Sequence, residues 1–116
     1  MTDDTGLDLI RGTVDLLVMQ ALAHGPLHGY GVAKWVRSAS RDTFNIEDRA
    51  LYIALHRLEA RKLLRGRAQT TNSGRQAKAY ELTDAGRAYL ESQASSWKRY
   101  VRAMQWVFSA AEAQSR

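Results

Sequence analysis

The stretch that decides the fold is ALYIALHRLEAR at residues 50–61, which is followed directly by a basic segment at residues 62–82. Leu51, Leu55 and Leu58 recur at i, i+4 and i+7, so they line one face of a helix. Polar and basic side chains fall on or near the opposite face. Such a helix can pack on a core and enter a DNA major groove. The order of helix and basic hairpin predicts a winged helix-turn-helix.

The basic segment is predicted to be the wing. Residues 63–70 indicate a first strand, residues 71–76 contain the turn formers Asn72 and Gly74, and residues 77–82 indicate the returning strand. On the preceding helix we expect Arg49, His56 and Arg57 to supply hydrogen bonds or charge to DNA. Tyr52 and Ile53 would supply apolar or base-edge contacts, and Arg75 and Lys78 of the wing would hold phosphates or enter a minor groove.

Positive charge is concentrated in the same region. Residues 41–78 hold nine basic and four acidic residues, which equals the whole net charge of +5 of the chain. Concentrated positive charge favours a polyanion, because binding releases counterions from its phosphates. The alternative is a solvated surface on a basic protein.

Composition excludes several other classes. The 116 residues suit one domain, or a small domain with an appended helix, and they include no cysteine. Disulfides, thiol catalysis and cysteine zinc sites are therefore excluded, and the chain suits a reducing cytoplasm. The acidic start and the lack of a long apolar stretch predict no signal peptide and no membrane contact. No catalytic motif, cofactor loop or metal-binding pattern is present, so we expect no enzyme.

Two helices are predicted before residue 50. The first covers residues 12–23 and starts a turn earlier, near Leu9; His24-Gly25-Pro26 ends it. The second runs from about His28 to Ser40. The expected fold is therefore mainly α with a small β-hairpin, in a winged helix-turn-helix domain over residues 1–83.

Residues 84–116 are predicted to form a long C-terminal dimerisation helix, which Thr83 caps. Its apolar residues are spaced 4, 3, 4, 3, 4, which is a heptad seam: Leu90, Ala94, Trp97, Val101, Met104 and Phe108. A second stripe contains Tyr89, Tyr100 and Val107. One stripe can pack on the chain's own domain while the other meets a second copy, which predicts a homodimer. The alternative is that both stripes pack on the first helix of the same chain. Trp106 falls opposite the seam and should be partly exposed.

Four segments in this order resemble the PadR family of bacterial transcriptional regulators. They are RGTVDLLV (11–18), GPLHGYGVA (25–33), LYIALHRLE (51–59) and YELTDAG (80–86). The resemblance covers about nine tenths of the chain, and the single C-terminal helix is similar to the small subclass of the family. It implies a cytoplasmic homodimeric repressor that binds double-stranded DNA at a pseudo-palindromic operator. It also implies a small planar hydrophobic effector near Trp97, because some members bind flat compounds between tryptophans of the last helix; Trp97 is otherwise plain interface core.

Three positions depart from the family pattern. Arg49 and Lys62 stand where the family usually has Gly, and Ile53 stands where it commonly has Pro. Arg49 either changes the docking on DNA or adds a phosphate contact. Lys62 must adopt a left-handed conformation, or the helix runs one residue longer.

Two other functions remain open on the sequence. One is a winged-helix interaction or dimerisation module without sequence-specific DNA binding. The other is a ligand-binding protein in which sensing is the retained activity.

Overall fold

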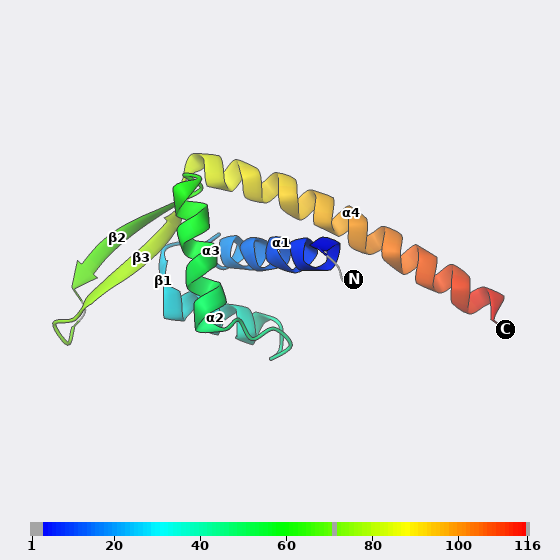
Figure 1. Ribbon diagram of the computed structural model, residues 1–116, viewed down its shortest axis with the longest axis horizontal. Coiled ribbons are helices and arrows are strands. Elements are labelled where there is room, and N and C mark those ends of the chain that lie inside the picture. The colour runs from blue at the N-terminus through cyan, green and yellow to red at the C-terminus, as the bar shows by residue number, and fades with distance from the viewer. Residues whose placement is uncertain (1–3, 71, 116) are drawn as a thin grey trace.

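The computed structural model describes residues 4–70 and 72–115, with side chains from Gly12 onward (Figure 1). Its elements follow in the order α1 (Asp4–Ala21), β1 (Leu27–His28), α2 (Gly29–Ala39), α3 (Asp48–Ala60), β2 (Leu64–Thr70), β3 (Gln76–Leu82) and α4 (Asp84–Gln114). The predicted fold class is confirmed: helices dominate, and one small antiparallel sheet carries the hairpin. α1 begins before the predicted Leu9, and α4 covers nearly all of the range 84–116 predicted for the C-terminal helix.

The core lies where α1, α2 and α3 meet. α1 contributes Val18 and Met19, and Leu22 follows directly after it; each of the three is at most 1% exposed. The predicted leucine face of α3 packs against the same cluster, since Leu51, Leu55 and Leu58 are also at most 1% exposed. Val32 and Val36 of α2 complete this cluster. Burial of this face leaves the other side of α3 in solvent.

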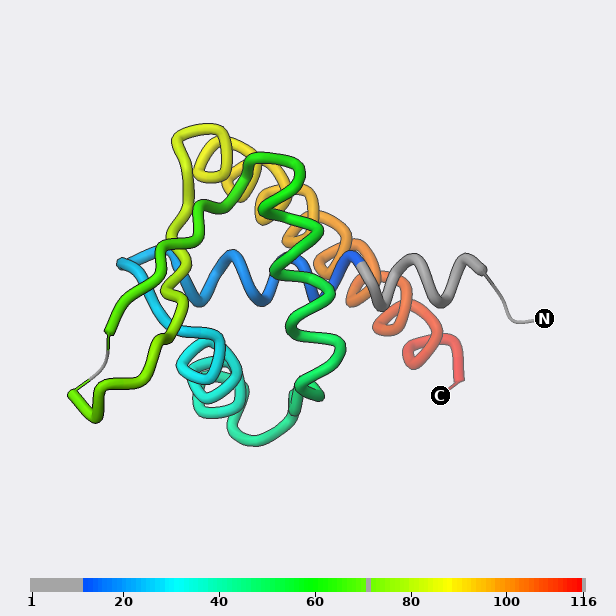
Figure 2. Tube along the Cα trace, turned by 60° about the vertical axis from the view of Figure 1, so that its left-hand side comes forward, coloured from blue at the N-terminus to red at the C-terminus, as the bar shows by residue number. Residues whose placement is uncertain are grey.

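The sheet has three strands in the order β1-β3-β2, with antiparallel pairing throughout. Gly66 of β2 pairs with Tyr80 of β3, and Leu27 of β1 pairs with Tyr80 on the other side. The sequence predicted β2 and β3 but not β1, because two residues are too few to show a strand period. β1 anchors the start of α2 to the hairpin, and the rest of the hairpin projects away from the helices (Figure 2).

A compact junction joins α3 to the sheet and to α4. Lys62 is left-handed, with a φ of 63°, so the first of the two alternatives for this residue is the one observed. The Leu63 and Lys62 amides donate to the carbonyls of Leu58 and Glu59 at 3.0 and 2.9 Å, which is the Schellman pattern. The Thr83 hydroxyl donates to the Lys62 carbonyl at 2.8 Å and accepts from the Gly86 amide at 2.9 Å, which confirms Thr83 as the cap of α4.

α4 packs on its own domain only over its first part. Leu90 is buried and Tyr89 packs against the core, whereas Val101, Met104 and Phe108 of the seam are 38%, 39% and 60% exposed in the single chain. With 31 residues α4 is about 46 Å long, and its C-terminal end projects past α1 (Figure 1). The alternative that both stripes pack on α1 of the same chain is therefore wrong. Trp106 is 67% exposed, as its place opposite the seam predicted.

Candidate nucleic-acid interface

The outward face of α3 carries most of the predicted DNA-contacting residues. Arg49, Tyr52, Ile53 and His56 are all exposed and follow the i, i+3, i+4, i+7 spacing of one helix face. Tyr52 and Ile53 are 43% and 49% exposed, which is unusual for large side chains on a helix that also supplies the core. The face thus combines a cation, an imidazole and two apolar side chains, which is a chemistry suited to base edges and thymine methyl groups.

Tyr52 lies close to the start of α2. A Cβ atom at Gly29, the first residue of α2, would lie 2.8 Å from the Tyr52 hydroxyl oxygen. The glycine therefore leaves room for the Tyr52 ring at this position. This contact places the exposed face of α3 beside the N-terminal end of α2.

Unlike the other residues of α3 that were predicted to contact DNA, Arg57 is directed towards α1. Its guanidinium forms a two-point ion pair with Asp15 of α1, with Nε donating to Oδ2 at 3.3 Å and Nη2 donating to Oδ1. The Asp15 side chain is 15% exposed and that of Arg57 is 31% exposed. The pair thus joins α3 to α1 on the side of α3 that faces the body of the protein. A base contact by Arg57 stays a prediction, and it would require this pair to open.

Ion pairs organise both faces of the wing. On one face Lys78 contacts Glu59 of α3 at 3.0 Å. On the other face Arg65 and Arg67 share Glu81 at 3.2 and 3.3 Å. Arg75 is exposed and follows Gly74, whose φ of 82° makes the turn. Of the two predicted wing contacts, Arg75 therefore lies next to the turn, whereas Lys78 lies on β3, opposite Ala68, and its side chain reaches back to Glu59 of α3.

Sequence reasoning missed basic and aromatic residues on α2 and β2. Tyr30 is 73% exposed, and Lys34 and Arg37 follow it at i+4 and i+7 on an exposed face of α2. Arg65 and Arg67 of β2 were counted in the charge but not assigned a role. The i, i+4, i+7 spacing of Tyr30, Lys34 and Arg37 was readable in the sequence and could have identified this face.

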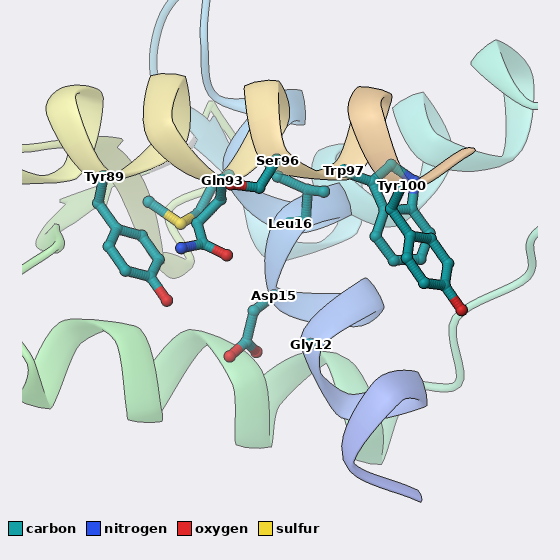
Figure 3. A pocket seen from close by; sticks show the side chains of 9 residues that line it. Gly12, Asp15, Leu16, Tyr89, Gln93, Ser96, Trp97 and Tyr100 are labelled. Carbon is teal, nitrogen blue, oxygen red and sulfur yellow. The ribbon is translucent and has the colours of Figure 1, made fainter. Parts of the chain in front are cut away.

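Two grooves flank α1, and Trp97 lines both. The groove between α1 and α4 has a volume of about 380 Å³, and its lining includes Asp15, Tyr89, Gln93 and Tyr100 (Figure 3). The groove of about 680 Å³ between α1 and the segment before α3 is lined largely by apolar side chains, among them Val14, Leu17, Phe44 and Ile46. The Trp97 and Tyr100 rings stack with centroids 5.4 Å apart.

Over the described ranges, no helix is long and apolar enough to cross a bilayer. The same part of the chain contains no group of three or more His, Cys, Asp or Glu side chains placed to hold a metal ion.

The model of the transcriptional regulator PadR-like family matches residues 18–92, which include α2, α3, the wing and the start of α4. This chain belongs to the PadR-like family. The family assignment and the winged-helix fold predicted from the sequence are thus confirmed, and the members of this family are transcriptional regulators rather than enzymes.

Solved structures show the same fold. A PadR family transcriptional regulator from Eggerthella lenta is 29% identical, with a TM-score of 0.71 over 90% of this chain and 88% of its own. A transcriptional regulator from Clostridium thermocellum is 24% identical, with a TM-score of 0.76 over 84% of this chain and 95% of its own. Bacillus subtilis PadR, solved in complex with operator DNA, is 20% identical, with a TM-score of 0.63 over 69% of this chain and 45% of its own.

We expect the Arg57–Asp15 pair to stabilise the packing of α3 on α1 as long as the pair is closed. In a double-mutant cycle of Asp15→Asn and Arg57→Gln, measured by urea unfolding, the coupling free energy should be about 1 kcal/mol. Arg49→Gln, on the exposed face of the same helix, serves as the matched control and should be additive with Asp15→Asn. Additive Arg57 and Asp15 variants, together with a relaxed base at one position per half-site in a binding-site selection with Arg57→Ala, would instead identify Arg57 as a base contact.

Proposed function

We propose that this PadR-family protein is a homodimeric repressor that binds a pseudo-palindromic operator in the cytoplasm. The main support for this proposal is the exposed face of α3, a helix whose other face is packed in the core. This exposed face contains Arg49, Tyr52, Ile53 and His56. A solved relative of the same fold, Bacillus subtilis PadR, has been captured with operator DNA. Two copies of α3 would enter successive major grooves on one side of the duplex.

The side chains would divide the contacts by chemistry. Arg49 and His56 would donate to base-edge acceptors or phosphates, and Tyr52 and Ile53 would contact thymine methyl groups. Arg75 at the wing tip would bind phosphates or enter a minor groove, and Lys78, further along β3, would hold the wing to α3 through Glu59. On α2, Tyr30 and Lys34 are exposed next to this face and would contact the backbone.

The exposed seam of α4 supports the dimer. A single chain leaves Val101, Met104 and Phe108 exposed, and a second copy would cover them. The wing and the projecting end of α4 lie towards opposite ends of the long axis of the molecule (Figure 1). Residues 1–83 would therefore bind DNA while residues 84–116 hold the two copies together, without competition between the two surfaces.

The grooves around Trp97 support an effector site. An indole that lines two grooves, stacked on a tyrosine, offers a flat apolar wall to a planar ligand. A ligand held there lies between the α1 scaffold and the dimerisation helix. Occupancy would favour one separation of the two α3 helices over another and so change operator affinity.

DNA affinity should fall steeply with salt, and α3 and the wing should carry the effect. Arg49→Ala with Arg75→Ala should flatten the slope of log affinity against log salt by about four per dimer if both contact phosphates. Arg99→Ala with Arg102→Ala removes the same charge from exposed positions of α4 and should leave the slope unchanged. Equal effects of the two double variants, or wild-type binding that ignores salt, would favour an interaction module without DNA.

Dimerisation should depend on the distal seam. Val101→Glu with Met104→Glu would place like charges opposite each other across a two-fold axis, so light scattering should report a monomer. Ser95→Glu with Ser109→Glu adds the same charge away from the seam and should leave a dimer. A wild-type monomer at micromolar concentration would contradict the dimer itself.

A planar aromatic cation or a phenol should quench tryptophan fluorescence at micromolar concentration and weaken operator binding. Trp97→Ala should abolish the quench and leave DNA binding largely intact, whereas Trp106→Phe, on the opposite side of α4, should keep the quench. A close-packed interface predicts the reverse, with no ligand response and a Trp97→Ala dimer that is less stable by about 3–5 kcal/mol. Titrations and thermal melts of the three proteins separate the two outcomes.

A further inference from the structure

A three-part contact joins the C-terminal end of α3 to the base of the wing. One carboxylate oxygen of Glu59, Oε1, accepts from the Lys78 ammonium at 3.0 Å. The other, Oε2, accepts from the backbone amide of Gly66 at 3.3 Å. Glu59 thus contacts both long strands of the hairpin, one through a side chain and one through the backbone.

Gly66 is the residue that lets this contact form. A Cβ atom at position 66 would lie 2.2 Å from Cε of Lys78 and 3.0 Å from Oε2 of Glu59. Lys78 pairs with Ala68 across the hairpin, and Gly66 pairs with Tyr80. The Lys78 side chain therefore runs diagonally over Gly66 towards Glu59, through space that any other residue would fill.

The Lys78 ammonium contacts both a carboxylate and an aromatic ring. The hydrogen bond to Glu59 raises the pKa of Lys78 above its ordinary value, with partial desolvation acting in the opposite sense. The ammonium also lies 5.4 Å from the centroid of the Tyr80 ring. Lys78 is thus charged at neutral pH and held between a carboxylate and an aromatic face.

We propose that Glu59 is a positioning residue, which holds the wing at a fixed angle to α3 so that helix and hairpin meet one duplex together. This inference rests on the proposed DNA binding. A carboxylate near phosphates lowers affinity for every DNA sequence by charge repulsion, so charge alone gives Glu59 no useful role at this surface. Holding the wing in a fixed position relative to α3 would give Glu59 a useful role. The contacts made by the wing and by α3 would then form together at one register on the operator.

A role of Glu59 through its charge and a role in positioning the wing predict opposite results for a variant that lacks the carboxylate. If Glu59 acts only through its charge, Glu59→Ala raises affinity for all duplexes alike. If it positions the wing, Glu59→Ala lowers binding to the best sequence relative to other sequences. The ratio of the two affinities therefore separates the two roles, whatever happens to either affinity alone.

The experiment measures this ratio for the full chain, with a duplex selected from random DNA by the wild type and a scrambled duplex of equal length. Glu59→Ala should lower the ratio by roughly threefold to tenfold, as expected for the loss of one or two hydrogen bonds. Glu59→Gln keeps an acceptor for the Gly66 amide and should recover part of the ratio. Glu81→Gln, which releases Arg65 and Arg67 on the other face of the wing, is the matched control; it should raise both affinities and leave the ratio unchanged.

Two further measurements support the test, and the first keeps it decisive if Glu59→Ala does not fold. Lys78→Met retains Glu59 but removes the bridge, so the ratio should fall while the salt slope stays unchanged. The amide resonance of Gly66 in labelled protein should move in Glu59→Ala and change less in Glu59→Gln, since only the former loses the acceptor.

Two results would overturn the proposal. The first is a ratio that stays at the wild-type value in Glu59→Ala, or in Lys78→Met if Glu59→Ala does not fold, while the wild type still discriminates between the duplexes. The second is a Lys78→Met variant whose salt slope falls by about two per dimer at constant ratio, because that result makes Lys78 a phosphate contact. A wild-type protein that binds neither duplex would overturn the proposed function, and this inference with it.

Discussion

The packing of α3 on α1 is the constraint on which the rest of the structure depends. Val18 and Met19 of α1, with Leu22 just after it, meet the leucines of α3 in a cluster from which water is excluded. Each such side chain contributes about 1.5–3 kcal/mol when it is buried, so a rotation of α3 that exposed its leucines would be costly. This packing fixes which side of α3 is presented outward, and it does so without any contribution from the outward residues themselves.

The junction that follows α3 fixes the positions of the wing and of α4 relative to α3. The Schellman turn at Lys62 directs Leu63 and Leu64 into the sheet, and the Thr83 hydroxyl connects the returning strand to that turn. Gly86 follows so closely that a Cβ atom there would lie 2.0 Å from the Leu63 carbonyl oxygen. The start of α4 is thus seated on the end of α3, which sets the direction in which the exposed seam leaves the domain.

Carboxylates on the surface fix the positions of several cationic side chains, in addition to offsetting their charge. Asp15, Glu59 and Glu81 each hold one or two cations, and each pair joins two different elements or two strands. The more exposed pairs, those of Glu59 and Glu81, contribute little to the free energy of unfolding. Their effect is geometric: they hold Arg57 against α1, Lys78 against the C-terminal end of α3 and Arg65 beside β3. Arg49 and His56 on α3 remain exposed on the face that the core does not use.

The sequence by itself determined the helices, the hairpin, the family and the outward face of α3, because these follow from local periodicity, turn chemistry and cap residues. It predicted the Thr83 cap and the seam of α4 for the same reason. Only the tertiary structure decided which partners the long side chains contact. Arg57 pairs with Asp15, which lies 42 residues away in the chain, and Lys78 pairs with Glu59 across Gly66. It also decided that β1 exists and that Trp97 lines two grooves. Helical and strand periods report which face a residue occupies, whereas its partner depends on elements that meet only when the core has formed.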